Sequence, residues 1–177
     1  ALRIASASQP IEAQSLPLKP EVLVLGGGIT GISIGQALAK SGIHVSLLER
    51  GSRLGGRIVE LRKFYNRPEE VDQWVEEKVS EFEKTPNITV LTHAELKRLD
   101  GHLGRFQAKI EAQDGTEKIL QVSAIVVATG YETQRETIGI YGHKRVITLS
   151  DMEELLSETK SPPPQWEGKS VGTVTFL

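Results

Sequence analysis

A glycine-rich turn between a strand and a helix constrains this chain more than any other feature. The apolar run Glu21–Leu25 (EVLVL) predicts a strand buried on both faces, and the letters GGGITG follow it at once. Apolar residues at helical spacing then continue to Ser41 and Gly42, and His44–Leu48 (HVSLL) predicts a second buried strand. We therefore expect a βαβ unit of about 30 residues, in which a helix joins two parallel strands.

The glycines of this turn form the pattern G-x-G-x-x-G, and each glycine has its own physical role. Gly26 permits the tight turn, Gly28 lets the backbone approach a pyrophosphate, and Gly31 lets the helix lie close to the strand. The anion would lie on the N–H groups of the helix N-terminus, at Ile29 and Thr30. Because the strand, the helix and the second strand are all present, the motif predicts dinucleotide binding.

An acidic residue stands where the second strand ends. Glu49 lies 18 residues after Gly31, the last glycine of the motif, at the position where a carboxylate accepts hydrogen bonds from a ribose diol. Its charge would repel a 2′-phosphate, which disfavours NADP and leaves NAD and FAD. Arg50 follows directly and is included among the candidate cofactor-binding residues.

Two further segments favour FAD. The sequence LGGR at residues 54–57 resembles the second glycine-rich signature of FAD-binding proteins with two dinucleotide folds. Glycines at 55 and 56 would let the main chain pass close to the cofactor's phosphates, and Arg57 could add charge-assisted hydrogen bonds. The sequence ATG at residues 128–130 resembles the element that closes the FAD fold of glutathione-reductase-like flavoproteins. The candidate cofactor-binding residues therefore also include Gly55, Gly56, Arg57, Thr129 and Gly130.

The remaining pattern predicts an α/β domain with a Rossmann-like FAD/NAD(P)-binding fold, a parallel sheet with an added β-meander. Residues 1–20 are expected to be a linker or extended arm, 21–160 the FAD-binding domain, and 161–177 a linker with the first strand of a following domain. Ser150 is the expected N-cap of a helix over 151–158. In the segment 95–100 a strand is expected, but the spacing of Leu96 and Leu99 is also compatible with a helix. The other expected elements are a helix over 68–84 and strands over 88–91, 95–100, 106–112, 118–122, 124–128 and 171–177.

Composition excludes several classes of protein. With 38% hydrophobic and 25% charged residues and a net charge of −2, the chain should fold, without a nucleic-acid-binding surface. It has no cysteine and no apolar run of the roughly 20 residues that span a bilayer, so we expect no thiolate chemistry and no membrane insertion. The four histidines lack metal-ligand spacing, and no catalytic residue can be assigned. We expect a fragment of a larger oxidoreductase, because the chain lacks an initial Met and stops on an apolar run. The expected location is cytoplasmic, and the apolar stretch at residues 2–7 is too short for a secretory signal.

The order of these segments resembles the FAD domain of the A-type subunits of heterodisulfide reductase and related proteins. The matching stretches are EVLVLGGGITGISIGQALAKSGIHVSLLERGSRLGGRI, TPNITVLTHAEL, AIVVATGYE, YGHKRVITLSDMEELL and GKSVGTVTFL. The resemblance implies bound FAD, electron transfer between a reduced donor and iron–sulfur partners, and a backbone contact between Ala94 and the adenine. One departure stands out. Family members carry cysteines shortly after the second glycine signature, and residues 59–66 (VELRKFYN) contain none.

Two other functions remain open. LLERGSRLGGRI also resembles the N-terminal signature of flavin amine oxidases and desaturases, although the short distance from Gly56 to Gly130 disfavours that class. A cofactor-free interaction module is the third alternative, and the intact glycine motif with Glu49 argues against it.

Overall fold

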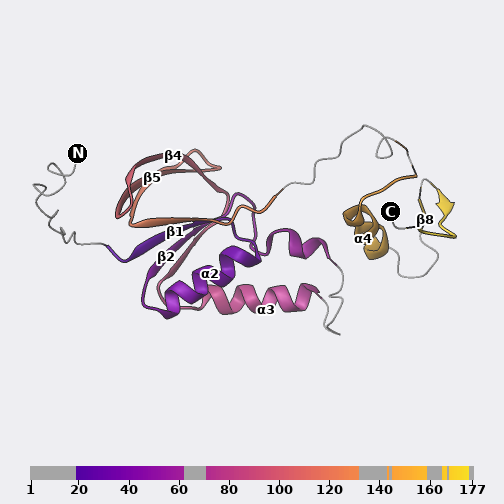
Figure 1. Ribbon diagram of the computed structural model, residues 1–177, viewed down its shortest axis with the longest axis horizontal. Coiled ribbons are helices and arrows are strands. Elements are labelled where there is room, and N and C mark those ends of the chain that lie inside the picture. The colour runs from indigo at the N-terminus through magenta and orange to yellow at the C-terminus, as the bar shows by residue number, and fades with distance from the viewer. Residues whose placement is uncertain are drawn as a thin grey trace, which may run out of the picture.

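A four-stranded parallel sheet forms the centre of the protein (Figure 1). The computed structural model describes residues 19–61, 71–131, 143, 145–158, 165–166 and 168–175. The sheet has the order β3-β2-β1-β7, and all of its pairs are parallel. The strands are β1 (Glu21–Leu25), β2 (His44–Leu48), β3 (Ile88–Leu91) and β7 (Ala124–Val127), which confirms the four strands predicted at these positions.

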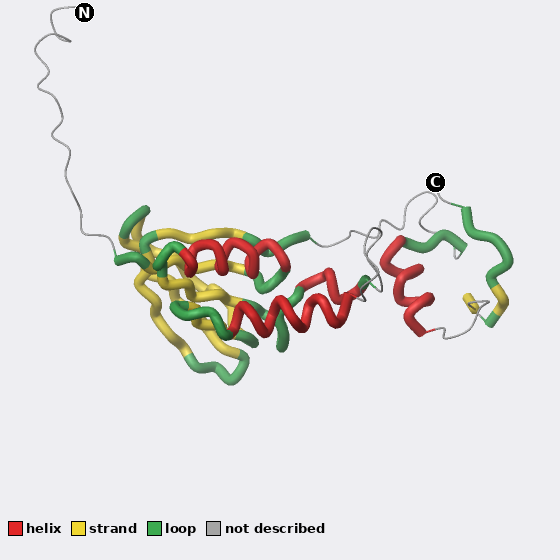
Figure 2. The backbone as a smooth tube through the Cα atoms, turned by 90° about the horizontal axis from the view of Figure 1, so that it is seen from below, coloured by secondary structure: helices red, strands yellow, loops and turns green. Residues whose placement is uncertain are grey.

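Both faces of the sheet are covered, which explains the uninterrupted apolar runs in its central strands. Val22 and Val24 of β1 face a cluster that includes Ile32 and Phe82 from helices α2 (Ile29–Lys40) and α3 (Val71–Glu83). Leu23 faces the opposite cluster, which contains residues of the antiparallel strands. The two helices lie on one side of the sheet and the β-meander on the other (Figures 1 and 2).

The helices confirm the predicted βαβ connection and the amphipathic segment. Helix α2 begins after Gly28 and ends at Lys40, where Ser41 and Gly42 terminate it. The described part of α3 begins at Val71, and its predicted residues 68–70 lie outside the described residues. The two helices approach closely at Gly35, where an added Cβ would lie 2.9 Å from the Phe82 ring.

Three antiparallel strands form the predicted meander, in the order β4-β5-β6. A register shift between Leu96 and Arg98 settles the ambiguity in the first strand. This bulge places Leu96 opposite Ile110 and Leu99 opposite Ala108, so two leucines three residues apart face the same side of a strand. The strands are β4 (Ala94–His102), β5 (Arg105–Ala112) and β6 (Glu117–Val122).

Helix α4 (Leu149–Glu158) is confirmed, but its predicted N-cap is wrong. Thr148 caps it instead, since its Oγ1 accepts the Asp151 N–H at 3.2 Å while Asp151 Oδ2 accepts the Thr148 N–H at 2.9 Å. This reciprocal pair of hydrogen bonds is a capping box, in which the backbone N–H groups of Thr148 and Asp151 each find an acceptor. Ser150 therefore lies inside the first turn of the helix.

The expected strand over 171–177 is not observed in its described part, residues 171–175. A short hairpin precedes it, in which β8 (Gln165–Trp166) pairs with β9 (Lys169–Ser170). Residues 1–18 and 176–177 lie outside the described residues, so the proposed division into segments stays a prediction. In the described part of the chain, no helix is long and apolar enough to cross a membrane.

Candidate functional site

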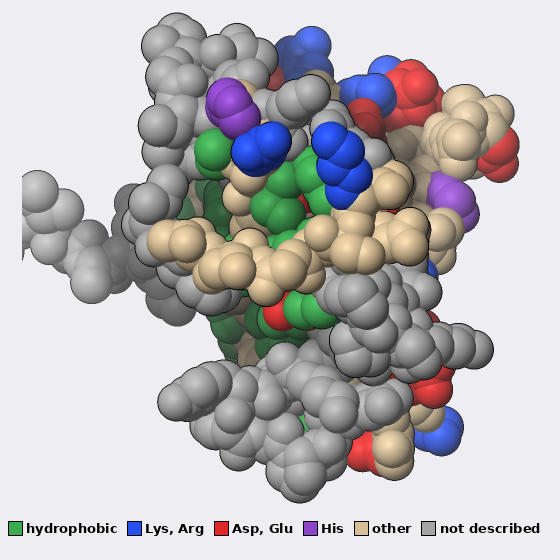
Figure 3. Space-filling view, turned by 90° about the vertical axis from the view of Figure 1, so that its right-hand side faces the viewer, with side chains coloured by type: hydrophobic (Ala, Val, Ile, Leu, Met, Phe, Trp, Pro, Cys, Tyr) green, Lys and Arg blue, Asp and Glu red, His purple; other side chains and the backbone are tan. Residues whose placement is uncertain are grey.

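The carboxyl ends of the parallel strands open into a cleft with a volume of about 2270 Å³. Small-molecule pockets usually hold about 300–1,000 Å³, so this cleft has room for an extended ligand. Figure 3 shows hydrophobic side chains in the hollow and Lys or Arg side chains beside them. All the candidate cofactor-binding residues line this cleft except Gly31, which lies behind the glycine turn.

The glycine turn is shaped by contacts with the protein's own backbone at two of its three positions. Gly26 has φ +105°, and an added Cβ would lie 2.3 Å from the Ala128 carbonyl oxygen. At Gly31 it would lie 1.9 Å from the Gly26 carbonyl oxygen. At Gly28 the nearest heavy atom would be 3.9 Å away, on Gly56. Packing therefore requires glycine at 26 and 31, but not at 28.

The first turn of α2 presents backbone N–H groups to the cleft. Gly28 is the N-cap of this helix and no side chain caps it. The first intrahelical bond runs from the Ile32 N–H to the Gly28 carbonyl at 3.0 Å. The N–H groups of the preceding residues have no acceptor within the helix, and the helix dipole adds positive potential at the same point.

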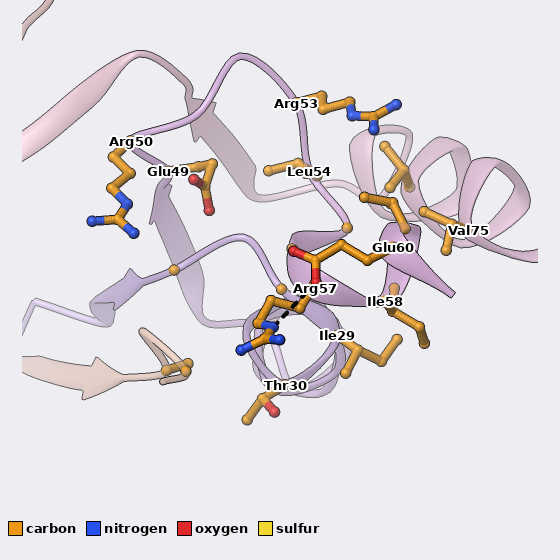
Figure 4. A pocket seen from close by; sticks show the side chains of 18 of the residues that line it. Ile29, Thr30, Glu49, Arg50, Arg53, Leu54, Arg57, Ile58, Glu60 and Val75 are labelled. Carbon is orange, nitrogen blue, oxygen red and sulfur yellow. Dashed lines mark ion pairs between the residues drawn. The ribbon is translucent and has the colours of Figure 1, made fainter. Parts of the chain in front are cut away.

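Glu49 is tied to the glycine turn by hydrogen bonds that its carboxylate accepts. One oxygen accepts the Gly27 N–H and the other the Gly51 N–H, both at 2.7 Å. Each carboxylate oxygen has two lone pairs, so these bonds are compatible with hydrogen bonds from a ribose diol. Arg50 lies beside Glu49 at the edge of the cleft (Figure 4).

The second glycine signature packs directly against the first. The Gly55 N–H donates to the Gly27 carbonyl at 2.8 Å, and Gly55 also forms an isolated parallel bridge with Gly28. An added Cβ on Gly56, which has φ +59°, would lie 2.8 Å from the Gly28 Cα. Gly56 is therefore needed for one glycine loop to pack on the other, a role that the sequence interpretation did not include. At Gly55, which has φ +116°, an added Cβ would instead lie 2.8 Å from the Val59 side chain.

Arg57, the residue predicted to contact phosphates, lies on the short 3₁₀ helix η1 (Gly56–Glu60). Its guanidinium forms an ion pair with Glu60, with Nε and Oε2 3.4 Å apart. It also contacts Tyr131 and Ser150, neither of which was predicted to be a site residue. Two features of the sequence could have pointed to these residues. Tyr131 follows the ATG element directly, and Ser150 lies within VITLSDMEELL, one of the stretches that resemble heterodisulfide reductase.

The remaining candidates line the cleft at the ends of β3 and β7. Ala94 is buried, and its N–H donates to the Glu49 carbonyl at 3.1 Å. Thr129 and Gly130 follow the end of β7, and Gly130 has φ +69°. The cleft therefore brings together segments from the whole length of the predicted domain.

No metal site is formed by the part of the chain that is described. Within it, no three His, Cys, Asp or Glu side chains are grouped closely enough to hold a metal ion. The four histidines are exposed and lie on separate segments. His102 contacts a neighbouring backbone carbonyl, and His143 accepts the Arg145 N–H.

Comparisons with known proteins identify relatives of this chain. The family described as pyridine nucleotide-disulphide oxidoreductase matches residues 2–151. An iron–sulfur A-type subunit of CoB–CoM heterodisulfide reductase from Methanopyrus kandleri is 31% identical over 111 residues, which are 63% of this chain and 17% of that protein. The A-type subunit of the H₂:CoB–CoM heterodisulfide, ferredoxin reductase from Methanothermobacter thermautotrophicus is 32% identical over 103 residues, 58% of this chain and 16% of that protein.

Solved structures support the same fold. L-proline dehydrogenase from P. horikoshii has a TM-score of 0.56 at 22% identity, over 62% of this chain and 22% of that chain. Thioredoxin reductase from Lactococcus lactis has a TM-score of 0.54 at 20% identity, over 64% of this chain and 36% of that chain. At these identities the likeness extends to the fold alone. The α/β fold expected from the sequence is confirmed, with its parallel sheet and antiparallel meander.

Proposed function

The chain belongs to the pyridine nucleotide-disulphide oxidoreductase family, and from this premise we propose that it is the FAD-binding module of a flavin-dependent oxidoreductase. It is similar to the A-type subunits of heterodisulfide reductase, as the sequence predicted. The matched segment is about a sixth of those relatives' length, so activity, substrates and partners of a whole protein are part of the proposal.

The observation that carries the proposal is the space in front of Gly28. Protein atoms explain why glycine stands at 26 and 31, since any side chain there would collide with backbone. Among the described residues, a Cβ at Gly28 would meet nothing closer than Gly56, 3.9 Å away, and the backbone has an ordinary extended conformation. A ligand that approaches the main chain closely would supply the missing reason for glycine.

The donors and acceptors around that space fit the ADP half of a dinucleotide. A pyrophosphate would lie on the uncapped N-terminus of α2, where Ile29 and Thr30 begin the helix. The Glu49 carboxylate would accept hydrogen bonds from the ribose hydroxyls, and its charge disfavours a 2′-phosphate. Arg57 would approach the pyrophosphate from the other side, and the second glycine signature before it favours FAD over NAD.

The protein's task in this proposal is to bind and orient the cofactor. Bound FAD would supply the electron chemistry at its flavin ring, and the residues of the cleft would fix the ring's distance from donor and acceptor. No described side chain is assigned a catalytic role. An iron–sulfur partner is proposed for the electrons because the Methanopyrus kandleri relative is named an iron–sulfur subunit. With no cysteine in the sequence, this chain cannot supply thiolate ligands to such a cluster.

A titration with FAD tests the proposal. Purified protein should bind FAD at one site per chain and shift the flavin's visible absorption, while NADP should bind more weakly. A structure of the complex should place the pyrophosphate against residues 26–31. Failure to bind any flavin would favour the cofactor-free interaction module, and a pyrophosphate far from the glycine turn would refute the assignment. A cytoplasmic location stays a prediction, tested by fractionation of cells that make the protein.

A further inference from the structure

Arg57 contacts two segments that lie far from it in the sequence, and one neighbour on its own 3₁₀ helix. Its Nη1 donates to the Tyr131 carbonyl at 3.4 Å, and its guanidinium carbon lies 5.0 Å from the centre of the Tyr131 ring. Its Nη2 donates to Ser150 Oγ in helix α4 at 3.2 Å. Glu60, on the same 3₁₀ helix as Arg57, forms an ion pair with it. Below, these four side chains are called the Arg57 cluster.

The Arg57 cluster lies beside the glycine turn. Gly56 immediately precedes Arg57 and packs against Gly28. The backbone of Arg57 is therefore one residue away from a contact with the glycine turn. Arg57, Tyr131 and Ser150 all line the same cleft as Gly28 and Thr30. Figure 4 shows the Arg57 side chain beside Thr30, at the first turn of α2.

We propose that Tyr131 and Ser150 are positioning residues of the cofactor site, which hold the Arg57 guanidinium where it binds the cofactor's pyrophosphate. The inference rests on the proposed function and extends it to α4, a helix that the sequence interpretation gave no role in binding. Neither residue needs to touch the cofactor.

The physical basis is preorganisation. An arginine side chain loses much rotamer freedom when it binds an anion, and a side chain already fixed loses less. The guanidinium carbon lies over the Tyr131 ring, and the two hydrogen bonds limit the rotation of the guanidinium. Arginine's planar fork of donors suits bidentate contact with phosphate only when its direction is set.

The position of Ser150 is itself fixed by the start of α4. The capping box between Thr148 and Asp151 spans Ser150, so the residue lies in a defined first turn. Asp151 Oδ2 accepts hydrogen bonds from both the N–H and the Oγ1 hydroxyl of Thr148, at 2.9 Å and 2.8 Å. The hydroxyl that accepts from Arg57 is therefore presented from the capped first turn of a helix rather than from a loop.

Binding measurements with FAD test the inference. Ser150→Ala and Tyr131→Leu should each weaken FAD binding about three- to tenfold, the value of one modest interaction. Ser150→Thr and Tyr131→Phe keep the hydroxyl and the ring, so they should restore most of the affinity. Ser41→Ala, which removes a serine hydroxyl bonded to Ala37 at the end of α2, is the matched control and should bind as the original protein does.

The same substitutions in an Arg57→Ala background separate positioning from a general structural effect. There, Ser150→Ala and Tyr131→Leu should have no further effect on affinity, because both act through the guanidinium. A second readout needs no cofactor. The N–H signals of the Arg57 side chain can be identified in NMR spectra by their loss in Arg57→Lys. These hydrogens should exchange slowly with water in the original protein and faster in Ser150→Ala.

The outcomes are distinguishable. If the original protein binds no FAD, the proposed function fails first and the inference falls with it. If FAD binds but Ser150→Ala and Tyr131→Leu leave its affinity unchanged, or weaken it equally without Arg57, the inference alone is overturned. A lower melting temperature with unchanged affinity would show that the Arg57 cluster only fastens α4 to the domain.

Discussion

The Glu49 carboxylate accepts the Gly27 N–H at 2.7 Å, across 22 positions of sequence. This bond joins the end of β2 to the glycine turn after β1, and the second oxygen of the same carboxylate holds Gly51 at 2.7 Å. Glu49 therefore shapes the two loops that would surround an ADP group, besides being the candidate ribose ligand. A change at Glu49 should therefore affect both cofactor binding and the local structure of the two loops.

Glu49→Gln should reduce both FAD affinity and stability. From the sequence alone, we predict loss of charge-assisted bonds to the ribose, worth about 1.5–3 kcal/mol, without unfolding. The structure adds a cost. The amide NH₂ cannot accept a hydrogen bond, so either Gly27 or Gly51 loses its partner, at about 1–3 kcal/mol. FAD titrations and thermal melts measure both effects.

The control for this substitution is Glu77→Gln, an exposed carboxylate on α3 whose Oε1 accepts a bond from Gln73. A glutamine oxygen can accept the same bond, so melting temperature and affinity should not change. If Glu49→Gln behaved like this control in both measurements, Glu49 would be an ordinary solvated residue at the end of a strand.

Substitutions at Gly31 and Gly28 should separate folding from binding. Gly31→Ala places a methyl 1.9 Å from the Gly26 carbonyl oxygen and should destabilise the fold by about 3 kcal/mol. Gly28→Ala adds a methyl that would make an ordinary van der Waals contact with Gly56 at 3.9 Å, so the melting temperature of this variant should stay close to the original. Its FAD affinity should fall at least about tenfold, because the methyl would stand where the pyrophosphate approaches.

Denaturation curves and FAD titrations on both variants decide this prediction. Normal FAD binding by a folded Gly28→Ala protein would contradict it, since no ligand would then explain the glycine. Wild-type stability in Gly31→Ala would show instead that the turn can shift away from α2.

The parallel sheet and its turn could be predicted from the sequence because their signals are local. Strands β1 and β2 are apolar runs bounded by turn residues, and the observed bounds match the predicted ones. The meander's first strand was ambiguous for a physical reason. A bulge gives Leu96 and Leu99 the spacing of a helix, and only the pairing with β5 reveals the strand.

The parts that sequence reasoning missed depend on reciprocal or distant contacts. The Thr148 capping box can be found in the sequence, since its two partners are three residues apart, but Ser150 was the nearer polar residue to the expected helix. The partners of Arg57 are different. Tyr131 and Ser150 lie 74 and 93 positions further along the chain, and no local pattern links residues at such separations.

The pH dependence of stability should include a contribution from Glu81. A hydrogen bond from Lys78, followed by one from Gln36, lowers the pKa of the Glu81 carboxyl below its ordinary value of 4.5. A pKa lowered by folding gives stability that is present above the unfolded value and lost as pH falls through the folded value. The melting-temperature difference between the original protein and Glu81→Gln should therefore shrink as the pH falls below 4.5.

This effect should be small, because Glu81 is exposed to solvent and salt screens such pairs. Thermal melts over a pH series measure it, with Glu77→Gln as the control on the same helix. A difference that stays constant across the acid range would show that the Glu81 charge contributes nothing to stability.

The 177-residue chain alone should show no sustained turnover with FAD. No described side chain is assigned a catalytic role, and the matched segment is only 17% of the Methanopyrus kandleri relative. Reduction of artificial acceptors by NADH or reduced ferredoxin is the assay, with free FAD as the reference. Turnover well above that of free FAD would show that these residues contain a complete active site.

Glu60→Gln should change FAD affinity in the direction opposite to the other substitutions. Glu60 lies 3.4 Å from Arg57 Nε and competes, as an anion, with a pyrophosphate for the same guanidinium. Removing its charge while keeping its shape should tighten FAD binding about two- to threefold at low salt, as for an exposed ion pair. Because salt screens exposed charges, the gain should disappear at high ionic strength. Glu117→Gln, which breaks an exposed pair with Lys109 on the meander, is the control and should leave affinity unchanged at every salt concentration. Weaker binding by Glu60→Gln would mean that Glu60 orients Arg57 rather than competing for it, and it would move Glu60 into the same positioning role as Tyr131 and Ser150.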